Sequence, residues 1–326
     1  MHNQEAPAEH PQLTIGMDIG GTNLRAAVID AEGTIVDLEK LPTPSEAPAL
    51  EDTIVRVVDT LRARHPQIGA VGLAIAGFLA PDLRTVRFAP HLPWEDVDVV
   101  ARLENRIKLP IVVEHDANAA AIGEHHRGVA QGVGTWALFA IGTGVGGALM
   151  HNGELYRGSF GTAPEFGHIT VVPGGRSCPC GKRGCLERYC SGSALQLAAH
   201  DRIAERAYPE SVLFTRFHRQ PEEISGRHIV KAARDGDKLG LEILRDVGEW
   251  LGRGLAMVQD ILDPELIVLG GGVSADADLF LYTARAEMAK NIVGQGRRPL
   301  ARVVPAELGG DAGMIGVALL AAQALD

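Results

Sequence analysis

The feature that most constrains the fold is an internal repeat. Residues 13–38 show two apolar runs around a glycine turn, Gly20-Gly21-Thr22-Asn23, followed by a second turn and a third apolar run. Residues 135–156 show the same order around Gly142-Thr143-Gly144, about 120 residues further along. Apolar runs that flank a short glycine turn are typical of β-hairpins. The repeat therefore predicts a duplicated α/β domain.

The segments between the repeats predict helices and buried strands. Residues 50–64 place apolar side chains on one helical face, and a long helix over 241–262 should end at Asp263-Pro264, because proline cannot continue it. We expect residues 185–199 to form one helix and residues 201–226 to be rich in loops. We expect three parts: a disordered tail over 1–12, a small α/β domain of 13–117 plus 308–326, and a large α/β domain over 118–307 that carries a zinc knot.

Composition and charge argue against several classes of protein. Hydrophobic residues make up 46% of the chain, which is enough for a large core. The formal net charge is −10 without a basic cluster, which disfavours nucleic-acid binding. The N-terminus lacks the positive start and apolar run of a signal peptide, and the uncharged stretch over 128–153 is interrupted by glycines. We therefore expect a cytoplasmic protein that binds neither nucleic acid nor membrane.

The glycine turns suggest phosphate binding. Gly142-x-Gly144-x-x-Gly147 matches the dinucleotide fingerprint formally, but a second strand follows it where that fingerprint needs a helix. One such turn alone is better interpreted as a simple hairpin. Two of them, with Gly270-Gly271-Gly272 downstream, favour backbone N–H groups that bind a nucleotide. Asp18, just before the first turn, either supports Mg²⁺ through water or caps the turn.

Asp116 is the candidate general base. It ends a short buried strand over 111–113 and precedes a good helix start at Ala117. Phosphoryl transfer needs positioning, charge neutralisation and a group that accepts the proton of the attacking hydroxyl. An Asp in this place is equally typical of a helix N-cap. The local sequence does not separate these two interpretations.

The cysteines predict a structural zinc site. All four lie within residues 178–190, and Cys178-x-Cys180-x₄-Cys185 with His168 supplies three thiolates and an imidazole. Such a ligand set is typical of closed tetrahedral zinc sites, whereas reduced surface cysteines are the alternative. Cys190 is better interpreted as a small packed side chain.

Zinc would also organise nearby polar side chains. A metal bound to His168 fixes its ring, and Glu165 and Glu187 lie close to the ligands in sequence. Carboxylates and imidazole suit sugar hydroxyls, although each glutamate taken singly is more often a surface residue.

Together these motifs resemble the ROK family (repressors, open reading frames and sugar kinases). The resemblance spans about residues 13–322. Within the family the chain is similar in particular to the bacterial ATP-dependent glucokinases. Its motifs are Asp18-Ile-Gly-Gly-Thr-Asn23, Glu114-His-Asp-Ala-Asn-Ala-Ala120, Ile141-Gly-Thr-Gly-Val-Gly-Gly147, Glu165-Phe-Gly-His168 and Cys178-x-Cys-Gly-x-x-Gly-Cys-x-Glu187.

The resemblance implies a fold, an activity and roles for residues. The fold is the ribonuclease H-like, actin-like ATPase fold, with two domains flanking a cleft. The activity is ATP-dependent phosphorylation of the glucose 6-hydroxyl, with Asp116 as base, Mg²⁺ bound with ATP, structural Zn²⁺, and a homodimer or homotetramer. The sugar would contact Gly77, His91, His115, Asp116, Glu165, His168 and Glu187. ATP would contact Asp18, Gly20, Gly21, Thr22, Asn23, Gly142, Thr143, Gly144, Gly270, Gly271, Gly272 and Val273.

Two positions depart from the family pattern, and other functions compete. His91 and His115 stand where these glucokinases usually have Asn, so mannose, N-acetylglucosamine and N-acetylmannosamine remain alternative substrates, and polyphosphate an alternative donor. A sugar-responsive repressor needs a helix-turn-helix domain, but only twelve residues precede Leu13. A zinc hydrolase needs an open metal position, which three thiolates and His168 would close.

Overall fold

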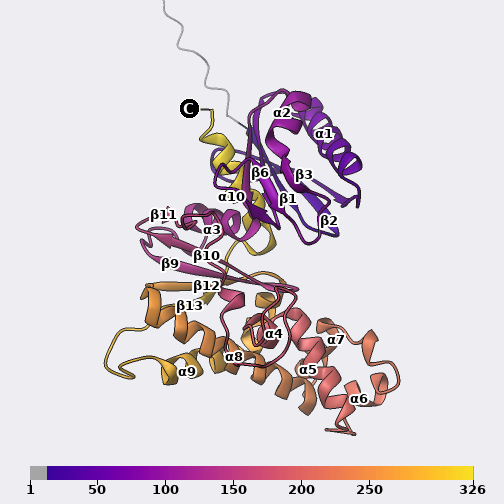
Figure 1. Ribbon diagram of the computed structural model, residues 1–326, viewed down its shortest axis with the longest axis vertical. Coiled ribbons are helices and arrows are strands. Elements are labelled where there is room, and N and C mark those ends of the chain that lie inside the picture. The colour runs from indigo at the N-terminus through magenta and orange to yellow at the C-terminus, as the bar shows by residue number, and fades with distance from the viewer. Residues whose placement is uncertain (1–12, 326) are drawn as a thin grey trace, which may run out of the picture. The chain divides into compact units, whose positions relative to one another are not determined.

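The sequence repeat corresponds to two five-stranded sheets in the computed structural model, which describes residues 13–325 (Figure 1). The first sheet contains β1 (Leu13–Ile19), β2 (Asn23–Ile29), β3 (Ile35–Pro42), β4 (Ile68–Ile75) and β8 (Ile111–His115). The second contains β9 (Trp136–Ile141), β10 (Val145–His151), β11 (Glu154–Leu155), β12 (Leu266–Gly270) and β13 (Arg302–Pro305).

Both sheets have the same topology. Their strand orders are β3-β2-β1-β4-β8 and β11-β10-β9-β12-β13. In each sheet the first three strands in sequence pair antiparallel, and the last two run parallel to the first. Because the same connectivity occurs twice, the prediction of a duplicated α/β fold is confirmed.

Packing divides the described residues into two units. The first comprises the described part of Met1–Gln131 with Arg157–Ala163 and Asp311–Asp326, and the second comprises Gly132–Tyr156 and Pro164–Gly310. The first unit runs past residue 117, where we placed the boundary, because helix α3 (Asp116–Arg127) packs against helix α10 (Ala312–Ala322). The tail expected over residues 1–12 lies outside the described residues.

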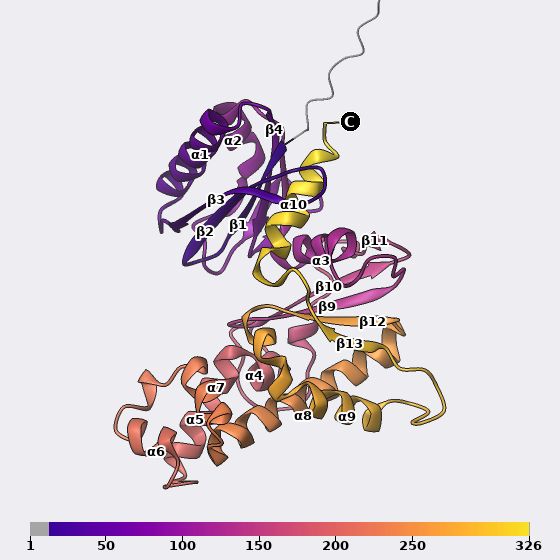
Figure 2. The same ribbon diagram turned by 180° about the vertical axis from the view of Figure 1, so that it is seen from behind.

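Within the first unit, helices cover both faces of the sheet (Figure 2). Helix α1 (Ala47–Arg64) presents Leu50 and Ile54 to a core shared with Ile15 and Met17 of β1. Helix α2 (Val99–Ile107) joins the same core. Helix α10 contacts β1 and β4 from the other face. A small sheet of β5 (Phe78–Leu79), β6 (Thr85–Phe88) and β7 (Glu95–Asp98) completes the unit.

Glycines let α10 approach its neighbours at backbone distance. A Cβ atom on Gly16 of β1 would lie 1.9 Å from the carbonyl oxygen of Met314, and one on Gly316 of α10 would lie 1.8 Å from that of Ala119. Real Cβ atoms do not occupy such positions, because interiors are close-packed. The interface between α10, α3 and the sheet therefore depends on these missing side chains.

In the second unit, helices α8 (Lys238–Leu262) and α9 (Leu281–Asn291) share a core with β9 and β12. The helix expected over 185–199 is broken: α4 (Glu187–Cys190) ends before Ser191, whose side chain caps α5 (Gly192–Ala204). The stretch over 201–226, expected to be rich in loops, holds helix α6 and the 3₁₀ helix η2. The remaining elements are α6 (Val212–Phe217), α7 (Gly226–Arg234), η1 (Phe166–His168), η2 (Pro221–Glu223), η3 (Gly272–Leu279) and η4 (Gly309–Asp311).

A bilayer-spanning helix would have to be both long and apolar. Over residues 13–325 no helix combines these two properties to the degree that crossing a membrane requires.

Gly316→Ala tests the close approach of α10. The added methyl group has no room against Ala119, so the free energy of unfolding should fall by about 2 kcal/mol or more, despite the better helix propensity of alanine. Gly313→Ala in the same helix is the matched control, since a Cβ atom there meets nothing nearer than the Asp116 carbonyl oxygen at 3.9 Å. Urea denaturation measures both, and equal effects would contradict the steric argument.

Candidate active site and metal centre

The residues predicted for the site are divided between the two units. The first unit carries the first glycine turn (Gly20–Asn23), Asp18, Gly77, His91, His115 and Asp116. The second carries the second glycine turn (Gly142–Gly144), Glu165, Glu187, the residues 270–273 and the four expected zinc ligands.

The first glycine turn is short and firmly held. The backbone N–H of Gly20 donates to the carbonyl oxygen of Asn23 at 3.1 Å, and the Thr43 hydroxyl donates to the Gly20 carbonyl oxygen at 2.6 Å. A Cβ atom on Gly21 would lie 2.6 Å from Cβ of His91. His91 therefore lies directly against this turn, and only glycine fits beneath it.

Gly77 places a second piece of backbone in this region. It follows β4, and a Cβ atom there would lie 2.8 Å from Cβ of Ala89 and 3.0 Å from the carbonyl oxygen of Phe88. This close approach holds the end of β4 against the segment that leads to His91. The structure thus brings together Gly21, Gly77 and His91, which are far apart in sequence.

Asp116 is the first residue of α3, and the N-cap is His115. Oδ1 of Asp116 accepts a hydrogen bond from the Ala117 backbone N–H at 2.7 Å and lies 3.3 Å from Nε2 of His115. The interpretation of Asp116 as an N-cap is therefore wrong by one residue. Its side chain is 45% exposed, so the carboxylate is accessible to a substrate hydroxyl.

Asp18 carries a destabilised negative charge. The pKa of this carboxyl group is raised from 3.8 to about 6, chiefly by burial and also by the nearby charge of Asp116, whereas Arg25 on the neighbouring strand partly offsets both effects. A buried carboxylate whose ionisation is opposed in this way is a group that a hard divalent cation would stabilise.

The second glycine turn is braced by the start of α5. The N–H of Gly142 donates to the carbonyl oxygen of Gly144 at 2.9 Å. The N–H groups of Gly192 and Ser193 donate to the carbonyl oxygens of Gly142 and Thr143 at 2.8 and 3.3 Å. Sequence reasoning missed this contact because it treated residues 185–199 as one helix, although Ser191-Gly192-Ser193 is a recognisable N-cap signal.

Glu187 reaches the same turn from α4. Its Oε2 accepts a bond from the Val145 backbone N–H at 3.0 Å, and a Cβ atom on Gly144 would lie 2.2 Å from that oxygen. Its Oε1 lies 3.9 Å from Sγ of Cys178. Glu187 therefore links the cysteine cluster to the second glycine turn, a role that its sequence position did not reveal.

The segment after β12 lies beside this turn. Gly271 has a φ of +81°, and a Cβ atom there would lie 2.5 Å from the carbonyl oxygen of Ile141. Val273 lies against Gly192, with 3.6 Å between its Cγ2 and a Cβ atom built on Gly192. The second unit thus gathers the second glycine turn, the α5 N-terminus and residues 270–273 in one place.

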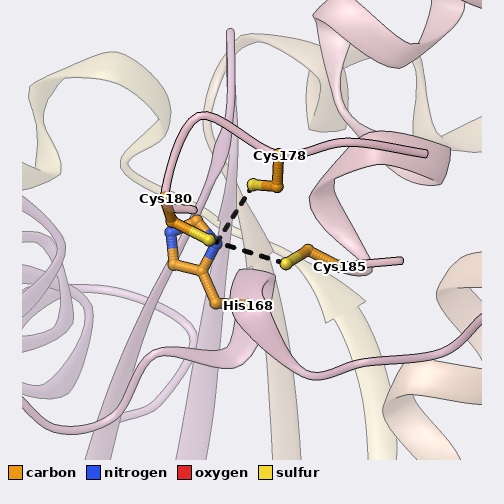
Figure 3. Close-up of side chains that lie close together, drawn as sticks. All are labelled: His168, Cys178, Cys180 and Cys185. Atoms are coloured by element: carbon orange, nitrogen blue, oxygen red, sulfur yellow. Dashed lines mark hydrogen bonds between the residues drawn. The ribbon is translucent and has the colours of Figure 1, made fainter. Parts of the chain in front are cut away.

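The four expected zinc ligands converge (Figure 3). One ligand atom each from His168, Cys178, Cys180 and Cys185 lie within 4.8 Å of one another. Sγ of Cys180 is 3.7 Å from Sγ of Cys185, and Sγ of Cys178 is 3.7 Å from Nδ1 of His168. Tetrahedral zinc with thiolate ligands places sulfur atoms about 3.8 Å apart. These residues therefore fit a zinc ion.

The two ring nitrogens of His168 face different groups, the cysteine cluster and Glu165. Nδ1 faces the cysteines, and Nε2 lies 3.9 Å from Oε2 of Glu165. Burial raises the pKa of the Cys178 and Cys185 thiols, to about 12 for Cys185, so ionising them requires a compensating cation. A metal bound to Nδ1 would fix the orientation of the ring and therefore the position of Nε2 next to Glu165.

Elemental analysis tests the metal centre. We expect about one zinc per chain in purified protein, because the four ligands form one closed site. Cys180→Ala should lose the zinc and lower the melting temperature. Cys190→Ala is the control, since Cys190 is buried outside the cluster and its loss should leave the zinc in place. Zinc retained at full stoichiometry by Cys180→Ala would contradict the assignment.

Asp18→Asn tests the cost of the buried charge. Because the pKa of Asp18 is higher in the folded protein, its ionisation costs stability above pH 6, and this cost disappears as pH falls towards 4. The variant should therefore be more stable than the parent at pH 8, by at most about 3 kcal/mol, without nucleotide or Mg²⁺. The advantage should shrink by pH 5, as denaturant titrations would show. The exposed Asp59→Asn is the control, and a variant less stable than the parent at pH 8 would contradict the argument.

Comparison with known proteins identifies the family. A model of the ROK family matches residues 14–324. The glucokinase of Streptomyces coelicolor is 41% identical over 311 residues, 95% of this chain and 98% of that protein. The glucokinase of Halalkalibacterium halodurans is 33% identical over 319 residues, 95% of this chain and 94% of that protein. The crystal structure of a ROK family glucokinase from Streptomyces griseus, in complex with glucose and AMPPNP, matches with a TM-score of 0.85 and 42% identity, covering 95% of this chain and 99% of that one. The two sheets of identical topology are those of the actin-like ATPase fold, and the chain belongs to the ROK family.

Proposed function

We propose that this protein is an ATP-dependent glucokinase, which transfers the γ-phosphoryl group of ATP to the 6-hydroxyl of glucose. The observation that carries the proposal is the Streptomyces griseus structure with glucose and AMPPNP, whose chain is 42% identical to this one along almost its whole length. The groups described within each unit, a half-exposed carboxylate, glycine turns and a cysteine cluster, are consistent with this proposal.

The proposed base is Asp116. The proton of the sugar 6-hydroxyl passes to its carboxylate, the oxygen bonds to the γ-phosphorus, and the bond from that phosphorus to the ADP oxygen breaks. A half-exposed carboxylate at the start of a helix suits this role, because it is accessible to the sugar while its bond to the Ala117 N–H restrains its orientation. His115 lies against it and contributes to the surface that the sugar meets.

The nucleotide is assigned to the glycine-rich segments. Backbone N–H groups of the first and second glycine turns would bind phosphates, and Gly270, Gly271, Gly272 and Val273 would border the adenosine. Mg²⁺ would neutralise phosphate charge, with Asp18 beside it, and would relieve the repulsion between Asp18 and Asp116.

The sugar is assigned to polar groups from both units. Glu165, His168 and Glu187 of the second unit would bind sugar hydroxyls, and Gly77, His91 and His115 of the first unit would also contact the sugar. Zinc would hold the His168 ring rigid through Nδ1. The thiolates of such a site need reducing surroundings, which favours the cytoplasm. The homodimer or homotetramer implied by the resemblance stays a prediction.

A coupled assay over a sugar panel tests the proposal. We expect the highest kcat/KM with glucose and ATP, above mannose, fructose, N-acetylglucosamine and N-acetylmannosamine. Polyphosphate should replace ATP poorly. A preference for an N-acetylated sugar would redirect the assignment to an N-acetylhexosamine kinase, and no turnover of any sugar would overturn it.

Asp116→Asn tests the base. The amide cannot accept the proton, so kcat should fall by roughly 10² to 10⁴, while sugar binding and the melting temperature remain near those of the parent. Steady-state kinetics, calorimetric titration with glucose and thermal unfolding measure the three quantities. Asp59→Asn on the exposed face of α1 is the control. A variant that turns over near the parent rate would show that Asp116 is not the base.

A further inference from the structure

Glu114 is a buried carboxylate two residues before the proposed base. Its side chain is 1% exposed. Oε1 accepts bonds from the His115 backbone N–H and from Nδ2 of Asn118, both at 2.9 Å. Oε2 accepts bonds from Nε and Nη2 of Arg157, at 2.9 and 2.6 Å. Both oxygens of this carboxylate are therefore fully engaged.

The bonds to Oε1 bracket Asp116. One holds the backbone of the residue before it, and the other holds the side chain of Asn118, two residues after it. The orientation of the Glu114 carboxylate thus fixes the β8–α3 turn from both sides. Within residues 13–325, the Asp116 side chain bonds to its sequence neighbours Ala117 and His115, so the direction of its carboxylate follows that of the turn.

Arg157 makes this arrangement possible. Burying a carboxylate to this degree is costly unless a partner of opposite charge lies beside it. The planar guanidinium is such a partner, with two N–H groups, of Nε and Nη2, that converge on Oε2 and hold this oxygen in place while the other two donors hold Oε1. Lysine would supply the charge from a single nitrogen on a flexible stem and would lack this rigid pair of donors to Oε2.

Arg157 comes from a part of the chain remote from β8. It begins the strap, residues Arg157–Ala163, which belongs to the first unit although the chain before and after it belongs to the second. The Ala163 N–H donates to the Arg157 carbonyl oxygen at 3.1 Å, which closes the strap. Gly161, with a φ of +77°, lies against the Leu79 backbone. The fold therefore delivers this guanidinium to Glu114 specifically.

We propose that Arg157 is a positioning residue for phosphoryl transfer, which acts through Glu114 to hold the Asp116 carboxylate in the direction that accepts the sugar proton. The inference rests on the proposed role of Asp116. Arg157 does not contact substrate in this role, so its loss should affect the chemical step and leave the binding of glucose and ATP largely intact.

Arg157→Lys tests the inference, because it keeps the positive charge and removes the rigid pair of N–H donors to Oε2 of Glu114. We expect kcat to fall by roughly tenfold or more, as for a misplaced catalytic group, with both KM values within about threefold of the parent. Arg102→Lys is the matched control: Arg102 pairs with the carboxylate of Glu51 at 3.1 Å in the same unit, away from the base. Its kcat should match the parent. An unchanged kcat in Arg157→Lys, or a loss explained by its folded fraction in thermal unfolding, would overturn the proposal.

Two further measurements separate positioning from mere stability. Methylguanidine should restore kcat in Arg157→Ala, whereas methylamine at the same concentration should not. Only methylguanidine has the planar pair of N–H donors that Arg157 supplies. In an Asp116→Asn background, Arg157→Lys should change the residual rate by less than about twofold, since its effect passes through Asp116. A full additional loss there would overturn the inference alone, whereas an active Asp116→Asn enzyme would overturn the proposed base itself.

Discussion

The rest of this structure depends on backbone brought within contact distance of backbone, which only glycine allows. Gly16 and Gly316 let α10 lie on the first sheet and on α3, and α3 begins with Asp116. Gly271 lets the end of β12 lie against Ile141, beside the second glycine turn. The absence of a side chain, which leaves backbone N–H groups accessible in the proposed phosphate-binding turns, therefore also allows the surrounding elements to pack closely.

In two places the protein brings together groups whose negative charge is opposed by their surroundings. Asp18 is ionised at neutral pH at a cost, because burial and Asp116 both oppose it. Three thiols converge with His168, and burial raises the pKa of two of them, Cys178 and Cys185. In both places a cation would remove the penalty, so binding and stability are coupled. Glu114 differs, since the protein supplies its counter-charge from Arg157.

The sequence predicted those features that depend on neighbours along the chain. Hairpins around glycine turns, the helix at 241–262 and the cysteine spacing are local patterns, and the structure contains all of them. The break at Ser191 and the boundary beyond residue 117 were missed, because they depend on which distant element each segment packs against. Glu187 was recognised as a polar group, but its bond to Val145 joins residues 42 positions apart.

The sequence by itself determined the duplicated α/β architecture and the ligand set of the proposed metal centre, because periodicity and residue chemistry are properties of short segments. It named Asp116 as a candidate base without separating that role from a helix N-cap. Only the tertiary structure decided how these groups are held. It placed His91 on Gly21, Glu187 on the second glycine turn, and Arg157 of the strap on Glu114. The physical reason is that the environment of a buried charge or a closely packed glycine depends on the residue beside it. That residue is brought there by the folding of distant segments, so local sequence does not reveal it.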